Sequence, residues 1–175
     1  MKVVGFGASG SRSSINQQFA TYVAKKLNED ATILHIADFP LPIYTIEEEQ
    51  ANGIPENAIA LMEQINEADV LVISLAEHNG SYTSFFKNTF DWLSRHKAAV
   101  FEGKKLILLA TAPGPRGGLG VLEAATNRFP RHGGEVIVSF SLPHFNENFH
   151  AEQGILQADK KQELEEALGA IISEL

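Results

Sequence analysis

The chain opens with KVVGFGASGSRSSIN, residues 2–16. Lys2–Phe6 is a short, mostly apolar run without alternation, which predicts a strand buried on both faces. Gly7–Ser14 is rich in glycine and serine and predicts a loop, and an amphipathic helical pattern begins at Ile15. The chain therefore starts as strand, loop and helix.

The same alternation continues to the C-terminus and predicts a single domain over residues 1–175. Alternating strands and helices indicate a parallel sheet with helices on both faces, and five strands in this length suit the flavodoxin-like, doubly wound α/β fold. The longest irregular stretch, Ile36–Gly53, is predicted to be an ordered surface loop. The predicted strands are Lys2–Phe6, Ala31–His35, Val70–Ala76, Lys105–Thr111 and Glu135–Val138, and the predicted helices are Ile15–Leu27, Pro55–Asn66, Ser84–Arg95, Leu119–Arg131 and Asp159–Leu175.

Composition excludes several classes of protein. The 44% hydrophobic content is enough for one core, and the absence of cysteine excludes disulfides, thiolate nucleophiles and thiolate-held metal clusters. No segment reaches the ~20 apolar residues of a membrane span and no signal peptide is apparent, so a cytoplasmic location is expected. The net charge of −8, from 22 acidic and 14 basic residues, argues against nucleic acid as a partner.

In doubly wound sheets, ligands bind beyond the carboxyl ends of the strands, near the point where the strand order reverses. Three predicted loops lie at such ends: Gly7–Ser14, Glu77–Thr83 and Ala112–Gly118. We call them the first, second and third loops. They are the candidate binding surface.

Glycines in the opening stretch match the spacing of a dinucleotide-binding fingerprint. They are Gly5, Gly7 and Gly10. In that fingerprint the glycines open the helix and an acidic residue closes the second strand. Here the helix begins later and the second predicted strand ends at His35, so the fingerprint is weak evidence.

Hydroxyl groups in the first loop favour a terminal phosphate instead. Four serines lie beside the N–H groups of a helix N-terminus, an arrangement suited to a doubly charged phosphate. Ser14 and Asn16 fit equally well as N-cap residues, and Arg12 fits either as a phosphate contact or as a solvated side chain. The four serines are Ser9, Ser11, Ser13 and Ser14.

The second loop lies in LVISLAEHNGSYTSFFKNTFDW, residues 71–92. This stretch resembles the NAD(P)H-dependent FMN reductase family, which includes azo-dye, quinone and chromate reductases. Members carry Pro-Glu-Tyr-Asn at the strand end, a Gly-Ser turn, Leu-Lys-Asn and then Asp-Trp. Ala76 and His78 replace the usual Pro and Tyr, and the first loop is two residues shorter than in the family. The matching residues are Glu77, Asn79, Gly80, Ser81, Lys87, Asn88, Asp91 and Trp92.

The resemblance spans roughly Lys2–Val138 and implies an FMN-dependent oxidoreductase. It implies NADPH or NADH as the electron donor, free flavin, a quinone or an azo compound as the acceptor, a ping-pong mechanism, and a homodimer or homotetramer. The residues that it places at FMN are Ser9, Ser11, Arg12, Ser14, Ile15 and Asn16 for the phosphate, Glu77, His78, Asn79, Gly80 and Ser81 along the ring, and Pro113, Gly114, Gly117 and Gly118 in the third loop.

No catalytic side chain is expected, because the flavin carries the hydride chemistry and the protein supplies position and electrostatics. Asp91 is therefore interpreted as a structural charge. The segment Asn146–Gly154, flanked and interrupted by Phe145 and Phe149, is a candidate to close over the substrate pocket. The other histidines lack the paired spacing of a metal-binding helix, so no metal is expected; they are His35, His96, His132, His144 and His150.

Some alternatives stay open at this stage. The aromatic stripe of the helix beginning at Ser84 is wider than a usual core face and fits either a subunit contact or a core helix with an exposed edge. A flavodoxin-like electron carrier is the alternative function, since an acidic surface suits docking to basic partners. A nicotinamide-binding fragment without flavin rests on the glycine spacing alone. The stripe residues are Phe85, Phe86, Phe90, Trp92 and Leu93.

Overall fold

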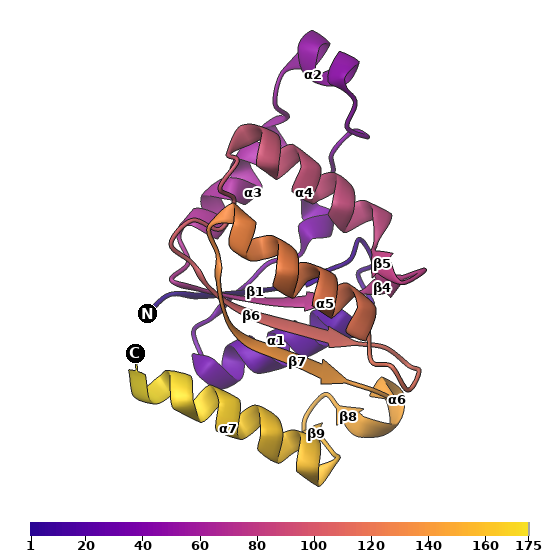
Figure 1. The fold of residues 1–175 in the computed structure, drawn as a ribbon, viewed down its shortest axis with the longest axis vertical. Helices are drawn as coiled ribbons and strands as arrows, with labels where there is room; N and C mark the ends of the chain where they lie inside the picture. The colour runs from indigo at the N-terminus through magenta and orange to yellow at the C-terminus, as the bar shows by residue number, and fades with distance from the viewer. Residues whose placement is uncertain (175) are drawn as a thin grey trace.

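A five-stranded parallel sheet forms the centre of the protein, which we describe from a computed structural model that places residues 1–174. The strand order is β2-β1-β3-β6-β7, so the chain reverses direction across the sheet between β1 and β3 (Figure 1). This order confirms the predicted flavodoxin-like, doubly wound fold. The strands are β1 (Val3–Ala8), β2 (Thr32–Ile33), β3 (Val70–Leu75), β6 (Lys105–Thr111) and β7 (Glu135–Leu142).

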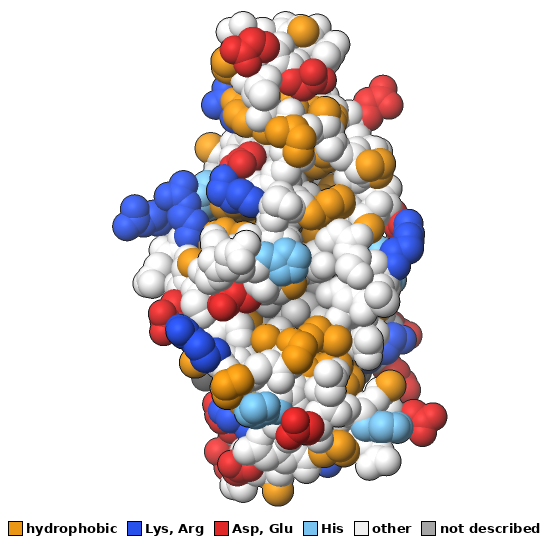
Figure 2. All heavy atoms as spheres, turned by 90° about the vertical axis from the view of Figure 1, so that its right-hand side faces the viewer, with side chains coloured by type: hydrophobic (Ala, Val, Ile, Leu, Met, Phe, Trp, Pro, Cys, Tyr) orange, Lys and Arg blue, Asp and Glu red, His pale blue; other side chains and the backbone are white. Residues whose placement is uncertain are grey.

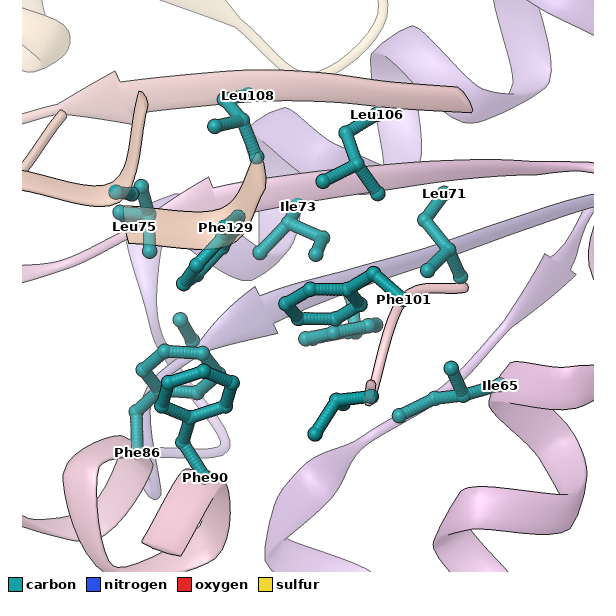
Figure 3. Close-up of a cluster of buried hydrophobic side chains, with 14 of the residues drawn as sticks. Ile65, Leu71, Ile73, Leu75, Phe86, Phe90, Phe101, Leu106, Leu108 and Phe129 are labelled. Carbon is teal, nitrogen blue, oxygen red and sulfur yellow. The ribbon is translucent and has the colours of Figure 1, made fainter. Parts of the chain in front are cut away.

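Helices cover both faces of the sheet and divide the core into two clusters (Figure 1). One face carries α3 (Glu56–Asn66), α4 (Ser84–His96) and α5 (Leu119–Arg128), and the other carries α1 (Ile15–Leu27) and α7 (Ala158–Glu174). On the first face, phenylalanines from α4 and from the segments around α5 meet the aliphatic side chains of β3 and β6 (Figure 3). Burial of these apolar surfaces on both sides explains why the central strands are continuous apolar runs.

The glycines of the opening stretch allow α1 to lie directly on β1. A Cβ at Gly5 would lie 2.7 Å from Cβ of Ala24, and one at Gly7 would lie 2.5 Å from the backbone nitrogen of Gln17. The Gly7 N–H donates to Oε1 of Gln17 at 2.9 Å inside this contact. Close packing of helix and strand therefore accounts for two of the three glycines that resemble a dinucleotide fingerprint.

Several predicted boundaries differ from the structure. β1 runs to Ala8, so Gly7 belongs to the strand and the first loop starts at Ser9. β7 runs to Leu142 instead of Val138, because this edge strand alternates between buried and exposed residues and its second half lacks an apolar run. The helix predicted to reach Arg131 ends at Arg128 and continues as the 3₁₀ turn η2 (Phe129–His132). The predicted end of the last helix, Leu175, lies outside the described residues.

The stretch Ile36–Gly53 is not the irregular loop that was predicted. It contains the 3₁₀ turn η1 (Ile36–Asp38) and the helix α2 (Ile46–Asn52), which lies at one end of the long axis (Figure 1). The hydroxyl of Thr45 caps α2 by accepting a hydrogen bond from the N–H of Glu48 at 3.1 Å. Thr-x-x-Glu is the sequence signature of such a cap, so this helix had a recognisable signal.

The segment that follows β7 is folded against α1. It forms a short helix, α6 (Phe145–Asn148), and a hairpin of β8 (Phe149–His150) and β9 (Gly154–Ile155). The ring of Phe149 lies 5.9 Å from that of Phe19 and 5.4 Å from that of Tyr22. Phe145 and Phe149 are buried in this core, and the closing of segment Asn146–Gly154 over a substrate pocket stays a prediction.

Substituting Gly7 by Ala tests the contact between α1 and β1. We expect Gly7→Ala to lower the free energy of unfolding by about 1–3 kcal/mol, because the new methyl group overpacks against a backbone atom that cannot move freely. Gly169→Ala is the matched control: its Cβ meets no atom within 4 Å, and alanine is the better helix former. Urea unfolding measures both, and equal stabilities would contradict the overpacking.

Candidate functional site

The three loops meet at one edge of the sheet. The arrowheads of the parallel strands point to the edge where β4, β5 and α6 lie (Figure 1). Figure 2 looks onto this edge, and uncharged atoms and hydrophobic side chains occupy most of its middle, while Lys and Arg lie mainly toward its sides. The middle of this edge therefore carries little charge.

The first loop presents free backbone donors at the N-terminus of α1. The Ser14 hydroxyl caps the helix by accepting from the N–H of Gln17 at 3.3 Å, so its role as an N-cap is confirmed. The N–H groups of Ile15 and Asn16 have no acceptor among the described residues, as is usual for a first helical turn. Such N–H groups and the helix dipole favour an anion.

Hydroxyls and one cation surround these donors. Ser9 accepts from the N–H of Ser11 at 3.2 Å, and the hydroxyls of Ser11 and Ser13 lie 3.3 Å apart on the exposed part of the loop. The guanidinium of Arg12 is 70% exposed and pairs with Asp38, which follows β2. Arg12 is therefore held at the rim of the loop by a carboxylate.

The side chain of Asn16 forms its hydrogen bonds inside the core. Its Oδ1 accepts from the N–H of Thr111 at 3.1 Å and from the hydroxyl of Ser74 at 2.8 Å, and its Nδ2 donates to the carbonyl of Thr111 at 3.0 Å. Only 2% of Asn16 is exposed. Any contact of this residue with a ligand would thus come from its backbone N–H.

The second loop folds as a tight hairpin of β4 (Glu77–His78) and β5 (Ser81–Tyr82). Asn79 and Gly80 form the turn with φ values of 52° and 75°. Two successive left-handed residues define a type I′ turn, for which Asn-Gly is the preferred pair. The Asn-Gly signal in the sequence could have predicted this hairpin, which exposes the turn and the His78 side chain at the strand edge.

Side chains of the second loop tie it to the other two. Thr83 caps α4, and its hydroxyl also donates to the carbonyl of Ala8 at the end of β1, 3.1 Å away. A carboxylate oxygen of Glu77 accepts from the N–H of Val121 in the first turn of α5 at 2.8 Å. Gly120 permits this approach, because a Cβ there would lie 2.9 Å from the same oxygen. The sequence did not reveal that Thr83 bonds to the end of β1 or that Glu77 bonds to the start of α5.

The third loop is held by close packing and by backbone bonds. Gly117 has φ 55°, and a Cβ there would lie 2.4 Å from the Ser141 hydroxyl, which donates to the Gly117 carbonyl. Gly118, with φ 77°, is the N-cap residue that precedes α5. The carbonyl of Gly114 accepts from the N–H of His144, but a Cβ on Gly114 would meet no atom within 4 Å. Gly114 and the exposed Pro113 therefore border open space, where a ligand has room.

The remaining motif residues on α4 stabilise the fold. Lys87 and Asp91 form an i,i+4 ion pair at 2.7 Å, which agrees with a structural interpretation of Asp91. Nδ2 of Asn88 and Nε1 of Trp92 both donate to the carbonyl of Pro42, at 2.9 and 2.8 Å. The wide aromatic stripe is thereby explained, because Trp92 supports the segment before α2 while the other members face the core or, in the case of Phe85, the backbone of Gly10.

A cavity of about 720 Å³ runs along the outer side of α1 and reaches the first loop, since Arg12 and Ser14 line it together with Tyr22, Lys25 and His35 among others. Residues 1–174 contain no group of three His, Asp or Glu placed to hold a metal ion. Over the same residues, no helix combines the length and the apolar character needed to span a bilayer.

Comparison with known proteins agrees with this geometry. The family described as NADPH-dependent FMN reductase matches residues 1–147. The chain belongs to this family.

Relatives and solved structures support the assignment. The chain is 31% identical to a 2-hydroxy-1,4-benzoquinone reductase of Burkholderia sp over 118 residues, 67% of this chain and 63% of that protein. It is 40% identical to a quinone reductase of Escherichia coli over 83 residues, 47% and 43% of the two chains. The structure of the flavoenzyme FerB, an NAD(P)H:(acceptor) oxidoreductase of Paracoccus denitrificans, superposes with a TM-score of 0.76 at 22% identity, covering 98% of this chain and 95% of that one.

Family membership confirms the predicted class of enzyme. It is an FMN-dependent oxidoreductase with NAD(P)H as the electron donor. The structure fits this cofactor: the free N–H groups and serines of the first loop suit its phosphate, and the open space beside Gly114 suits a flat ring. The individual FMN contacts stay predictions.

Asn16→Ala separates the structural role of this residue from a role in binding. The substitution leaves Ser74 and the Thr111 N–H without their partner in a buried place, so we expect the free energy of unfolding of the FMN-free protein to fall by about 1–3 kcal/mol. Ser11→Ala, on the exposed part of the same loop, should leave that stability unchanged. Denaturant unfolding of both FMN-free variants tests this, and an unaffected Asn16→Ala would show that its three hydrogen bonds do not support the fold.

Proposed function

We propose that this enzyme holds FMN across the three loops and passes two electrons from NAD(P)H to a quinone or a similar small acceptor such as free flavin or an azo compound. The proposal rests on one observation, namely that side-chain hydrogen bonds join the three loops into one surface. Thr83 ties the second loop to the end of β1, and Glu77 ties it to the start of α5. Because these two hydrogen bonds already hold the loops in place, a ligand that binds there does not have to order them itself.

In this arrangement the first loop would bind the phosphate through the N–H groups of Ile15 and Asn16 and the hydroxyls of Ser9 and Ser11, with Ser14 and Arg12 beside them. The hairpin residues 77–81 and Pro113, Gly114, Gly117 and Gly118 would border the ring. FMN supplies the redox chemistry when bound. Glu77 has no acid–base part in the proposal, because FMN carries the hydride chemistry. One of its carboxylate oxygens accepts from the N–H of Val121.

We further propose that donor and acceptor occupy one site in turn, which gives ping-pong kinetics. The site borders solvent through exposed residues of the second and third loops, among them Ser81, Pro113 and Arg116. Names of relatives support the acceptor class, because two of them are quinone reductases, one of 2-hydroxy-1,4-benzoquinone. A quinone is therefore the first acceptor to test.

The deciding experiment records the visible spectrum of the FMN-loaded protein under anaerobic conditions. Addition of NADPH or NADH is expected to bleach the flavin band within seconds, and 1,4-benzoquinone is expected to restore it. Initial rates at several fixed quinone concentrations should give parallel double-reciprocal lines. A bound flavin that neither nucleotide reduces would instead identify an electron carrier, and intersecting lines would exclude the ping-pong order.

The double variant Ser9→Ala/Ser11→Ala tests the phosphate end of the site. Loss of hydroxyl donors to a charged group is expected to weaken FMN binding by about 1–3 kcal/mol, or roughly tenfold to a hundredfold in Kd. Fluorescence quenching of FMN on titration measures the affinity. Ser139→Ala, in the middle of β7 and outside the three loops, serves as the control, and an unchanged Kd in the double variant would remove Ser9 and Ser11 from the phosphate site.

The chain is also proposed to assemble as a homodimer or homotetramer, as the family resemblance implies. Light scattering coupled to size-exclusion chromatography is expected to give two or four times the mass of 19.1 kDa. A mass of one chain over a wide range of protein concentration would contradict this proposal.

A further inference from the structure

The dipeptide Asn-Gly occurs twice in the chain, at Asn52–Gly53 and at Asn79–Gly80. Asparagine is chemically labile, and most of all before glycine, because a residue without Cβ does not hinder attack by its backbone nitrogen on the preceding side chain. For this attack the glycine N–H must be free and the asparagine amide must be able to turn toward it. The structure places the two pairs in opposite situations.

The first pair is held by hydrogen bonds on both reacting groups. Asn52 is the last residue of α2, and its Nδ2 donates to Oε1 of Glu48 at 2.9 Å. The N–H of Gly53 donates to the carbonyl of Glu49 at 2.8 Å. Both bonds must break before the glycine nitrogen can reach the side chain of Asn52, and each adds to the barrier.

The second pair has neither of these bonds. Asn79 and Gly80 form the exposed turn of the β4–β5 hairpin at the carboxyl edge of the sheet (Figure 1). Within residues 1–174, neither the side chain of Asn79 nor the N–H of Gly80 has a hydrogen-bond partner. A Cβ at Gly80 or at Gly53 would meet no atom within 4 Å, so hydrogen bonding rather than crowding distinguishes the two pairs.

The contacts that hold the hairpin lie outside its turn. Tyr82 packs in the core, and the side chains of Glu77 and Thr83 bond to α5 and to β1. Each strand of the hairpin has only two residues, and an isolated two-stranded hairpin is marginally stable. The backbone rotation that brings the Gly80 nitrogen to Cγ of Asn79 therefore breaks few contacts.

We propose that Asn79 is a site of spontaneous deamidation. The Gly80 nitrogen gives up its proton and forms a bond to Cγ of Asn79, while Nδ2 leaves with a proton as ammonia, so that a succinimide ring remains. Water then opens the ring. Hydrolysis at Cγ leaves aspartate, and hydrolysis at the backbone carbonyl leaves isoaspartate, in which the main chain runs through Cβ and Cγ. No group is oxidised or reduced.

Both products change the turn that borders the proposed FMN site. Aspartate adds a negative charge to it, and isoaspartate also inserts a methylene group into the main chain, for which a two-residue type I′ turn has no place. Deamidation therefore lowers the affinity for FMN. This consequence rests on the proposed function, whereas deamidation itself does not.

The test keeps the full chain in warm, mildly alkaline buffer and follows both asparagines by mass spectrometry. Digestion after glutamate separates the pairs, because Glu49 and Glu56 flank the first and Glu77 and Glu102 flank the second. We expect Asn79 to be converted at least about tenfold faster than Asn52, which has hydrogen bonds to break. Equal rates, or slower conversion of Asn79, would overturn the proposal.

Two controls show whether the folded structure sets these rates. In guanidinium chloride both pairs lose their hydrogen bonds, so the two rates should become similar. A difference of the same size in the unfolded chain would show that hydrogen bonding is not its cause. A synthetic peptide of residues 77–83 gives the rate of the unrestrained pair, and a folded chain with intact Asn79 after that peptide is fully converted would also overturn the proposal.

Fluorescence quenching of FMN then compares fresh and aged chains. The aged chain is expected to bind FMN about tenfold more weakly, as the loss of one contact would cause. Asn79→Gly is the control, because Gly-Gly supports the same turn and has no amide to lose, so its affinity should not change on ageing. Equal affinity of fresh and aged chains would overturn the consequence for FMN. A fresh chain that does not bind FMN would contradict the proposed function, and the mass spectra would still decide the deamidation.

Discussion

One buried amide, that of Asn16, joins the first turn of α1 to the carboxyl ends of β3 and β6 through three hydrogen bonds. Because water is excluded there, breaking any of these bonds would leave a polar group unpaired, so the start of α1 has a single favourable position. The Gly7–Gln17 contact fixes the same helix against β1. The free N–H groups at the helix N-terminus are consequently placed by the core, and the serines of the first loop surround them.

The sequence allowed the doubly wound fold and α1 to be predicted because the central strands are buried on both faces and α1 has a clear amphipathic pattern. The second half of β7 was missed because an edge strand alternates and has no apolar run. α2 buries none of its residues, so it gave no periodic signal, and only its Thr45 cap could have revealed it. The side-chain ties of Glu77 and Thr83 join residues distant in sequence, which no local pattern encodes.

The motif that indicates the family acts here largely through the scaffold. Asn88 and Trp92 hold the carbonyl of Pro42, and Lys87 pairs with Asp91, all away from the strand ends. The carboxylate of Glu77 accepts a hydrogen bond at the N-terminus of α5, where a negative charge is favourable. A matching motif can therefore identify a family correctly even where several of its side chains stabilise the fold, as Lys87, Asn88, Asp91 and Trp92 do here.

The two residues of β5 in the second loop have opposite surroundings. Ser81 and Tyr82 are neighbours in β5, and successive side chains of a strand point to opposite sides. Ser81 is exposed at the strand edge, whereas Tyr82 packs among Phe86 and Phe129. Aromatic packing of Tyr82 therefore holds β5 from the core side, and the Asn79–Gly80 turn is attached to a strand that the core already positions.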